Sequence, residues 1–458
     1  MLTRPHKIIF IQPTYPTSPF GPAQLPVGLG YLAEQLEEND IAYEVCDVSL
    51  DGEDSLFYKI EKHKPEFVGI SMMSLDVYSH YKLIKKIKLK FPDVKTLAGG
   101  PHISFVKQAA LEECAYIDLA IVQEGEVAIV ELLKGQDLKN IKSLIFKNEV
   151  GQVISNEIGP FIQELDAISF PKYRKFKMHL YSSSMQIISS RGCPYSCIFC
   201  GAHFSMGKMW RARTAESIIK EIDYWCEKGY TTVSFTDSNF FLNKNRVMDL
   251  CERLKEKDLK ITMISDGMRA DNSDFEMLRK MKESGLFSVA IGVESANDHV
   301  LKRTRKGETL SQIENAIKTC ISLDIHVILF FIIGLPGETK NDVENSFKLA
   351  LKYPIQDAYF FNVNPLPKTE LFEWAENNNY LLVSKEKIYE NIGGMGSIPL
   401  IATPELSYDD RRKLYIRGLS VQKKVRRKHA MRMRIRFVNS FFDSLVKRMA
   451  RQQKYLSR

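Results

Sequence analysis

Three cysteines lie close together in one short stretch of the chain. Cys193, Cys197 and Cys200 stand four and three residues apart. Thiolates are the ligands that iron–sulfur clusters take, and a cube of four irons that is held by three cysteines keeps one iron open. Catalytic metal centres keep such an open position, whereas structural sites close their shell. The stretch therefore predicts a catalytic 4Fe–4S cluster.

Two other chemistries are open to the same residues. A structural zinc site needs a fourth ligand, and His203 stands near enough in the sequence to supply it. A redox disulfide uses a pair of cysteines, and three clustered cysteines exceed a pair. The remaining cysteines are isolated on apolar segments and are expected to be small buried hydrophobes: Cys46, Cys114, Cys226, Cys251 and Cys320.

The three cysteines directly follow the first strand of a repeating strand–helix pattern. Strands are expected at Met185–Ser189, Thr232–Thr236, Lys260–Ile264, Ser288–Val293, Val327–Ile333 and Tyr359–Val363, with helical periodicity between them. Six such units indicate a partial (β/α)6 TIM-type barrel, whose chemistry takes place at the carboxyl ends of its strands. Those ends carry polar residues or glycine: Asp237, Arg269, Glu294, Gly334 and Asn364.

This arrangement resembles the radical S-adenosylmethionine (SAM) superfamily. The resemblance rests on the three cysteines, on the aromatic Phe199 before the last of them, and on the segments Gly292–Ser295 and Ile333–Thr339. It implies that SAM contacts Phe199, Asp237, Arg269, Glu294 and Gly334, with Glu294 at the ribose and the Gly334 segment beside the adenine. One departure is Thr236-Asp237-Ser238, which stands where relatives carry Gly-Gly-Glu to hold the SAM amino group.

Each of these assignments has a plainer structural alternative. Arg269 could pair with Asp266 or Asp271. Glu294 could form a salt bridge at the barrel mouth, and Gly334 could serve only the turn that ends its strand.

The first 135 residues show a second strand–helix alternation. Strands are expected at Lys7–Gln12, Tyr43–Val48, Phe67–Met72, Lys95–Ala98 and Leu119–Val122, and helices at Leu25–Glu38, Ser55–Lys62, Val77–Phe91 and Phe105–Cys114. This order predicts a doubly wound (Rossmann-like) parallel sheet, which binds ligands at the carboxyl ends of its strands. The whole chain is thus expected to be an α/β protein.

The segments at those strand ends resemble the cobalamin (B12)-binding domain that precedes many radical SAM enzymes. The resemblance implies cobalamin contacts at Gly28, Ser71, Gly99, Gly100, Glu124 and Gly125. One departure is the loop Pro13–Pro19, which has no histidine for the cobalt. His102 is either a ligand or a hydrogen-bonding residue. The alternative is a flavodoxin-like domain that has no cofactor.

The rest of the chain divides by composition. Residues 136–183 are expected to be a linker with a hairpin over 143–155, residues 184–378 the barrel, and residues 379–458 a C-terminal region. Gly393–Gly396 suggests a loop over the barrel mouth. The chain carries a net charge of +8, but residues 411–458 hold 17 lysines and arginines against one acid, Asp443. The remainder is therefore net negative.

The basic tail predicts an amphipathic helix over Val421–Met449. Its apolar face would contain Val438, Phe441, Phe442, Leu445 and Met449. Three uses are open: docking on the acidic body, contact with anionic lipid, and binding to nucleic acid, for which no recognition motif is present. We expect a cytoplasmic protein because no signal peptide is visible, with peripheral contact to the inner face of the membrane as one alternative.

Together these resemblances imply a radical SAM enzyme with a 4Fe–4S cluster, SAM and cobalamin. The cluster would cleave SAM to a 5′-deoxyadenosyl radical, and the cobalamin subgroup often transfers a methyl group to the substrate carbon. The first hypothesis is a C-methyltransferase, and the second is an enzyme that cyclises, rearranges or oxidises its substrate. A zinc-stabilised RNA-binding protein is the third. Expected partners are a small or lipid-like substrate and a reductant such as flavodoxin or ferredoxin.

Overall fold

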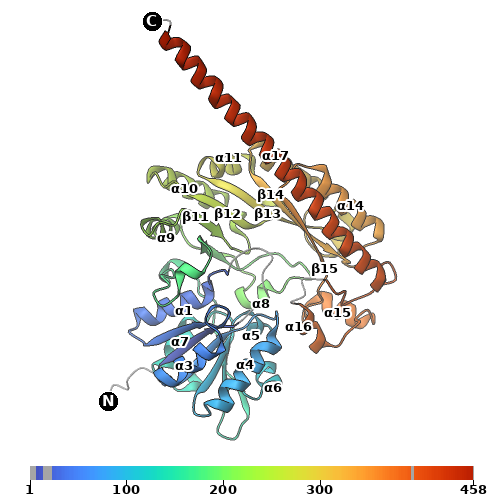
Figure 1. The fold of residues 1–458 in the computed structure, drawn as a ribbon. Helices are drawn as coiled ribbons and strands as arrows, with labels where there is room; N and C mark the ends of the chain where they lie inside the picture. Colours follow the sequence, from blue (N-terminus) through green and yellow to red (C-terminus); the bar gives the residue numbers. More distant parts are fainter. Residues whose placement is uncertain (1–6, 14–22, 393–396, 457–458) are drawn as a thin grey trace.

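The computed structural model of the chain describes residues 7–13, 23–392 and 397–456, and it contains two large parallel sheets (Figure 1). The first sheet has the order β2-β1-β3-β4-β5-β6-β7. Its parallel strands are β1 (Ile8–Gln12), β2 (Tyr43–Asp47), β3 (Phe67–Ser71), β4 (Lys95–Gly99) and β5 (Leu119–Ile121). They are buried along most of their length, as strands of a sheet covered by helices on both faces must be. The predicted doubly wound sheet is confirmed.

The helices of this sheet include those predicted at Leu25–Glu38, Ser55–Lys62 and Val77–Phe91, and two at Val48–Asp51 and Glu126–Leu133 that were not predicted. They are α1 (Val27–Glu38), α2 (Val48–Asp51), α3 (Glu53–His63), α4 (Val77–Lys90), α5 (Pro101–Val106), α6 (Ala109–Glu113) and α7 (Glu126–Leu133). The helix predicted at Phe105–Cys114 is two short helices. Lys107 adopts a positive φ of 56°, which breaks the helix between them, and Pro101 starts α5 at the position where its missing N–H costs nothing.

The hairpin predicted over 143–155 is present, and it extends the first sheet. β6 (Leu144–Lys147) pairs antiparallel with β5 and with β7 (Val153–Ser155). Leu144, Ile145 and Phe146 are buried. Because β6 has apolar side chains on both of its faces, this part of the expected linker is buried as a strand of the first sheet.

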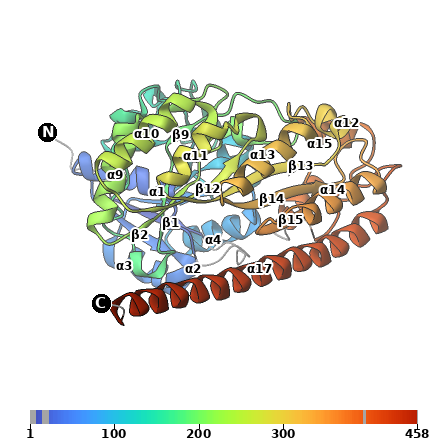
Figure 2. The same ribbon diagram turned by 90° about the horizontal axis from the view of Figure 1, so that it is seen from above.

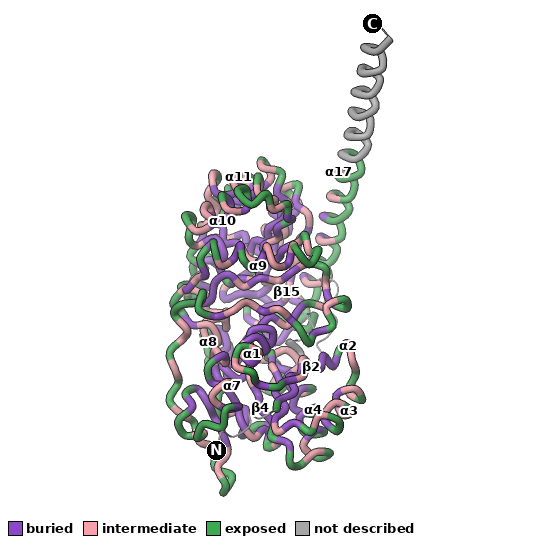
Figure 3. The backbone as a smooth tube through the Cα atoms, turned by 90° about the vertical axis from the view of Figure 1, so that its left-hand side faces the viewer, coloured by how far each residue is buried: buried purple, intermediate pink, exposed green. Residues whose placement is uncertain are grey.

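The second sheet forms an open barrel. Its strands are β8 (Ser184–Ile187), β11 (Thr232–Phe235), β12 (Thr262–Met268), β13 (Leu286–Glu294), β14 (His326–Ile333) and β15 (Asp357–Asn362), all parallel and in chain order. The helices of this part are α9 (Ala215–Glu227), α10 (Lys244–Glu256), α11 (Phe275–Glu283), α12 (Asp298–Arg303), α13 (Leu310–Ser322), α14 (Lys340–Lys352) and α15 (Glu370–Asn377), whereas α16 (Lys385–Ile392) packs on α4 of the first sheet. Buried residues concentrate in the two sheets (Figure 3). The partial barrel is confirmed.

Local sequence fixes where the outer helices begin. Thr214, Asn243, Asp274, Thr309 and Thr339 each accept a hydrogen bond from a backbone N–H in the first turn of the following helix. Such caps satisfy donors that would otherwise lack a partner. The segments that follow the strands therefore end at fixed helix starts, and they lie at the barrel mouth.

An insertion after β8 carries the cysteines. β9 (Ser190–Arg191) pairs antiparallel with β10 (Arg211–Ala212), and α8 (Ala202–Met206) lies between them in the chain. The three cysteines occupy the irregular loop between β9 and α8. The loop thus begins and ends at ordered elements.

The C-terminal helix α17 spans Tyr408–Leu456, well beyond the predicted Val421–Met449. Its first half lies along β15 and α14, and its second half projects from the body (Figures 1 and 2). Val421 and Val425 are buried, and Arg426 pairs with Asp357 at 2.8 Å. This half shows the predicted docking on the body.

Two predictions for the C-terminal region fall outside the described residues. They are the apolar face formed by the side chains of Val438, Phe441, Phe442, Leu445 and Met449, and the loop Gly393–Gly396. Over the described part of the chain, no helix has the length and apolar character needed to cross a membrane.

Replacing Gly418 by leucine should loosen the docking of α17. A Cβ added at Gly418 would lie 2.9 Å from Cβ of Phe360 and 3.1 Å from its Cγ, atoms that cannot move far. Overpacking of this kind costs about 1–3 kcal/mol. We expect a lower free energy of unfolding and faster proteolysis within α17. The neighbouring exposed Leu419, changed to alanine, is the control and should alter stability by less than about 0.5 kcal/mol. Unchanged stability in Gly418→Leu would contradict this packing.

Candidate functional site

The cysteine loop is held by backbone contacts and not by regular structure. Cys193 N–H donates to the carbonyl of Gly207 at 3.2 Å, and Cys200 N–H donates to that of Cys197 at 3.1 Å. Gly192 has a φ of +87°, and a Cβ there would lie 2.0 Å from the Met209 carbonyl oxygen, so only glycine fits before the first cysteine. The three cysteines are half-buried.

The three thiols lie in one electrostatic neighbourhood. Burial raises the pKa of the Cys197 and Cys200 thiols, and Cys193 raises that of Cys200 further, as Cys200 does for Cys197. The ammonium of Lys306 and the guanidinium of Arg269 act in the opposite direction on Cys197. These cations favour the thiolate form, which is the form that binds metal.

This donor set fits an iron–sulfur cluster. The described residues hold no group of three or more His, Cys, Asp or Glu side chains arranged for one metal ion. A 4Fe–4S cube takes each thiolate at a different iron. Three cysteines in one loop, with Lys306 and Arg269 acting on Cys197, supply the thiolate ligands and the positive charge that such a cluster needs.

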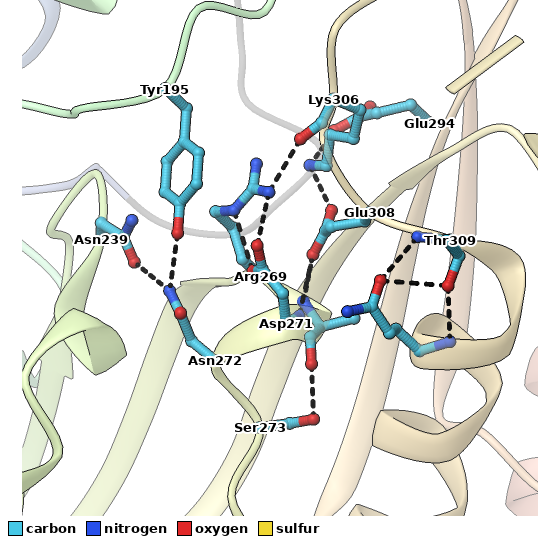
Figure 4. A network of polar contacts seen from close by, with 12 residues as sticks. Tyr195, Asn239, Arg269, Asp271, Asn272, Ser273, Glu294, Lys306, Glu308 and Thr309 are labelled. Atoms are coloured by element: carbon cyan, nitrogen blue, oxygen red, sulfur yellow. Dashed lines mark hydrogen bonds and ion pairs between the residues drawn. The ribbon is translucent and has the colours of Figure 1, made fainter. Parts of the chain in front are cut away.

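The loops that follow three barrel strands meet the cysteine loop in one polar network (Figure 4). The guanidinium of Arg269 lies 3.5 Å from the centre of the Tyr195 ring and donates to the Lys306 carbonyl at 2.8 Å. Lys306 Nζ contacts Glu294 Oε1 at 3.1 Å and Glu308 Oε2 at 3.3 Å. Buried charges are stable in such a place only when they are paired.

Two of the predicted SAM residues belong to this network. Arg269 binds Asp271 through Nε at 3.0 Å and Nη2 at 2.8 Å, so the pairing alternative holds for it. Glu294 has a φ of +62°, an unusual conformation for a residue with a side chain. Its negative charge raises the pKa of the Cys197 and Cys200 thiols. Its place beside the thiols is consistent with a ligand contact.

Lys306 and Glu308 were not predicted. They follow α12 and not a strand, so a search of strand ends passes them over. The signal was a dense run of charges, Lys302–Glu308, that ends in two side chains which the fold buries.

Asp237 has a role that the sequence did not predict. Its carboxylate is buried and accepts hydrogen bonds from Ser189 N–H at 2.6 Å, from Ser190 Oγ at 2.9 Å and from Ser189 Oγ. Burial raises its pKa, and Arg246 acts against that rise. Asp237 thus positions the segment that leads into the cysteine loop. Its contact with SAM stays a prediction.

Gly334 is fixed from both sides of its backbone. Its N–H donates to Glu338 Oε2 at 2.6 Å, and its carbonyl accepts from Arg411 Nη1 at 3.0 Å. Glu338 Oε1 also accepts from Ser295 Oγ at 2.9 Å. A Cβ at Gly334 would lie 1.5 Å from Arg411 Nη1, and φ is +88°. The ends of β13 and β14 are therefore joined, and α17 takes part through Arg411.

Phe199 packs in an apolar cluster. It and Ile198 lie against Val300, Leu335, Val363 and Leu371. Leu371 N–H donates to the Ile198 carbonyl at 3.1 Å. This cluster shields one side of the cysteine loop from water.

Two buried amide atoms at the barrel mouth have no hydrogen-bond partner among the described residues. They are Nδ2 of Asn239, which follows β11, and Oδ1 of Asn364, which follows β15. Buried polar atoms normally have partners. A polar ligand at the mouth would supply them, so the residues present fit a small molecule such as SAM there.

The predicted cobalamin residues divide into two groups. Ser71 and Gly99 end β3 and β4, and Gly100 follows with a φ of +93°. A Cβ at Gly99 would meet only the Ile121 carbonyl, at 3.8 Å, and one at Gly28 would meet nothing within 4 Å. Gly28 and Gly99 therefore leave the room that a bulky ligand at the strand ends needs. A Cβ at Gly100 would instead lie 2.8 Å from Met72 N, and one at Gly125 would make an ordinary contact with Leu32 at 3.4 Å.

Glu124 lies in a salt-bridge network between the two sheets. Its carboxylate contacts Arg211 Nη1 at 2.9 Å and Arg191 Nη1 at 3.1 Å. It also accepts from Ile162 N–H at 2.7 Å. Glu124 therefore joins the first sheet to the cysteine-bearing insertion, and its contact with cobalamin stays a prediction.

His102 is a buried hydrogen-bonding residue. Nδ1 lies 3.1 Å from Ser74 Oγ, and Nε2 lies 3.1 Å from Tyr81 OH. Burial lowers the pKa of the imidazole to about 3. Both ring nitrogens are engaged, so the hydrogen-bonding alternative holds. The loop 14–19, which lacks a histidine, lies outside the described residues.

Comparisons with known proteins agree with the geometry. Residues 187–350 match the profile of the radical SAM superfamily, and residues 19–133 match that of the B12 binding domain. An uncharacterised methyltransferase of Pyrococcus horikoshii is 34% identical over 83% of this chain and 85% of its own. The anaerobic magnesium-protoporphyrin IX monomethyl ester cyclase of Cereibacter sphaeroides is 26% identical over 80% of this chain and 63% of its own.

A solved structure shares the fold. The radical SAM methyltransferase TsrM of Kitasatospora setae, with cobalamin and a [4Fe-4S] cluster bound, superposes with a TM-score of 0.72 at 20% identity, over 83% of this chain and 79% of its own.

Replacing Glu338 by glutamine should change how stability depends on pH. Burial raises the pKa of Glu338 from 4.5 to about 7. The folded state therefore binds this proton more tightly than the unfolded state, and the stability it contributes is lost as the pH rises through about 7. Between low and neutral pH, the free energy of unfolding of Glu338→Gln should therefore rise relative to that of the wild type by up to about 3 kcal/mol.

Urea unfolding across that pH range measures this difference. The exposed Glu227, changed to glutamine, should leave the pH dependence of the wild type as it is. Parallel stability curves for the wild type and Glu338→Gln would contradict the raised pKa.

Proposed function

Because this chain belongs to the radical SAM enzymes that carry a B12-binding domain, we propose that Cys193, Cys197 and Cys200 hold a 4Fe–4S cluster in it. SAM would bind at the iron that they leave open, and cobalamin at the strand ends of the first sheet. The reaction would be the methylation of a small-molecule substrate. The observation that carries the proposal is the loop of three cysteines, whose Tyr195 ring stacks on the Arg269 guanidinium at the barrel mouth, 3.5 Å from the ring centre.

The residues of the chain have distinct tasks in this reaction. When bound, the reduced cluster supplies the electron that splits SAM to a 5′-deoxyadenosyl radical, and the corrinoid supplies the methyl group. Lys306 and Arg269 place positive charge beside the thiolates. Ile198 and Phe199 exclude water from one side of the loop. Glu294 and the Gly334 turn offer the polar groups for SAM.

Methyl transfer is favoured over cyclisation by the relatives. The 34% identical relative, matched over most of both chains, is called a methyltransferase, whereas the cyclase is 26% identical. We propose a carbon of the substrate as the methyl acceptor. A low-potential flavodoxin or ferredoxin would supply the electron.

The products released from SAM test this function. Cluster-loaded enzyme with hydroxocobalamin, a one-electron reductant and a deproteinised cell extract should release both 5′-deoxyadenosine and S-adenosylhomocysteine, the by-product of methyl transfer. Cys197→Ala should release neither above background and should lose the iron–sulfur absorbance. Cys226→Ala, which removes a cysteine of α9 outside the loop, should retain both.

Two outcomes would change the assignment. Release of 5′-deoxyadenosine without S-adenosylhomocysteine would favour cyclisation, rearrangement or oxidation. A protein that binds zinc and no iron after anaerobic reconstitution would overturn the proposal.

We further propose that residues 423–435 of α17 contact an anionic lipid surface. Lys423, Lys424, Arg427 and Lys428 are exposed on this part of the helix. Met431 and Ile435 expose 61% and 54% of their surface among these cations. A helix that presents both kinds of side chain binds at the headgroup level of membranes. A lipid-like substrate would suit an enzyme held there.

Vesicle sedimentation tests this contact. The protein should pellet with phosphatidylglycerol vesicles and not with phosphatidylcholine vesicles, and less so at high salt, because each cation near an anionic surface contributes about 1 kcal/mol. Reversing Lys423, Lys424, Arg427 and Lys428 to glutamate should lower vesicle affinity at least about tenfold. Lys255→Glu/Lys260→Glu on the barrel surface is the control. Equal binding to both lipids, or binding to RNA instead, would contradict the proposal.

A further inference from the structure

Two arginines connect the cysteine insertion to the first sheet. Arg191 stands two residues before Cys193, and its guanidinium contacts Glu124 at 3.1 Å and Glu126 at 2.7 Å. Arg211 lies opposite it on the paired strand and contacts both oxygens of Glu124 at 2.9 Å. Both arginines come from the barrel domain, and both glutamates come from the first domain. We call these four residues the interdomain quartet.

The quartet is buried and electrically balanced. The exposed fractions of its side chains are 9% or less, and two positive charges face two negative ones. Burial alone lowers the pKa of Arg191, but Glu126 and Glu124 raise it above its usual range. Removing one member would leave a buried charge without compensation, which is strongly destabilising for the contact. The two domains are therefore held in one relative position at this point.

A second interdomain contact lies on the other side of the cysteines. Phe204 of α8, four residues after Cys200, packs edge-on against Phe105 of α5, with ring centres 4.5 Å apart. Leu366 is also close, 3.0 Å from a Cβ built at Gly201. In Figure 1, α8 lies at the junction of the two domains. The cysteine loop is thus anchored on the first domain both before Cys193 and after Cys200.

Both anchors belong to the ligand-binding edge of the first sheet. Glu124 and Glu126 follow the carboxyl end of β5, and Phe105 lies in α5, which begins directly after Gly99-Gly100 at the end of β4. Ligands of doubly wound sheets bind at this edge. A ligand that orders these loops must also affect the two anchors of the cysteine loop.

We propose that Arg191 and Arg211 are positioning residues which couple the ligand edge of the first domain to the cysteine loop. Corrinoid bound at that edge then stabilises the cluster in the loop, and the cluster in turn strengthens corrinoid binding. The inference rests on the proposed function, since it assumes both cofactors. The mutual effect follows from thermodynamic linkage, which requires the coupling to be equal in both directions.

Cluster stability with and without corrinoid tests the coupling. The anaerobically reconstituted full-length enzyme is mixed with an iron chelator, and the loss of iron–sulfur absorbance is followed in the presence and absence of hydroxocobalamin. In the wild type we expect hydroxocobalamin to slow cluster loss by about tenfold, a typical size for coupling between two sites. In Arg211→Met the cluster should form, but hydroxocobalamin should change its rate of loss less than about twofold.

Two further variants separate coupling from a general loss of structure. Arg211→Lys keeps the positive charge, so hydroxocobalamin should still slow cluster loss in this variant, but less than in the wild type. Arg279→Met removes an exposed arginine that pairs with Glu276 and Glu283 on α11, and it should keep the full effect. If Arg211→Met does not fold, Arg211→Lys and the wild type still decide the outcome.

The reciprocal measurement uses hydroxocobalamin binding. Titration of cluster-free and cluster-loaded wild type should give a tighter hydroxocobalamin affinity when the cluster is present. If hydroxocobalamin binds and the cluster forms, but neither affects the other, the coupling is wrong while the proposed function stands. If the wild type forms no iron–sulfur cluster, the proposed function itself fails. An undiminished effect in Arg211→Met would show that the quartet does not carry the coupling.

Discussion

The site depends on holding a loop that has no regular structure of its own. Eight residues carry three thiolates that repel one another, so the loop must be fixed from outside. Asp237 binds the backbone and hydroxyl groups that lead into it, Arg191 fixes its first turn to the first domain, and the Leu371 N–H holds Ile198 in its middle. Each bond is worth only about 1 kcal/mol by itself. Together they define where three sulfurs stand.

Charge balance is the second requirement, and the barrel mouth meets it with a short network. Burial raises the pKa of the Cys197 and Cys200 thiols and so opposes the ligand form. Lys306 and Arg269 oppose that effect, yet two buried cations would themselves be unstable. Glu294, Glu308 and Asp271 pair with them. These three carboxylates therefore stabilise the buried cations that favour the thiolate form of Cys197.

The sequence predicted what depends on local pattern. The two strand–helix alternations and the residues at the strand ends follow from periodicity and motif, and the fold agrees with them. The sequence did not predict the long-range partners of those residues. Asp237 and Glu124 end strands, and each binds a partner far along the chain. Lys306 and Glu308 were missed because their importance comes only from burial beside the cysteine loop.

The C-terminal helix shows why such long-range partners matter to the site. An open barrel leaves β15 as an edge strand, and exposed edges need a cover. The docked half of α17 provides it, and one of its residues reaches further. Arg411 is buried and donates to the carbonyl of Gly334, whose N–H is held by Glu338. Glu338 also binds Ser295, the residue after Glu294. Arg411 therefore helps to align the ends of β13 and β14, which are expected to contact SAM. The first turn of the basic helix α17 is thus part of the barrel mouth.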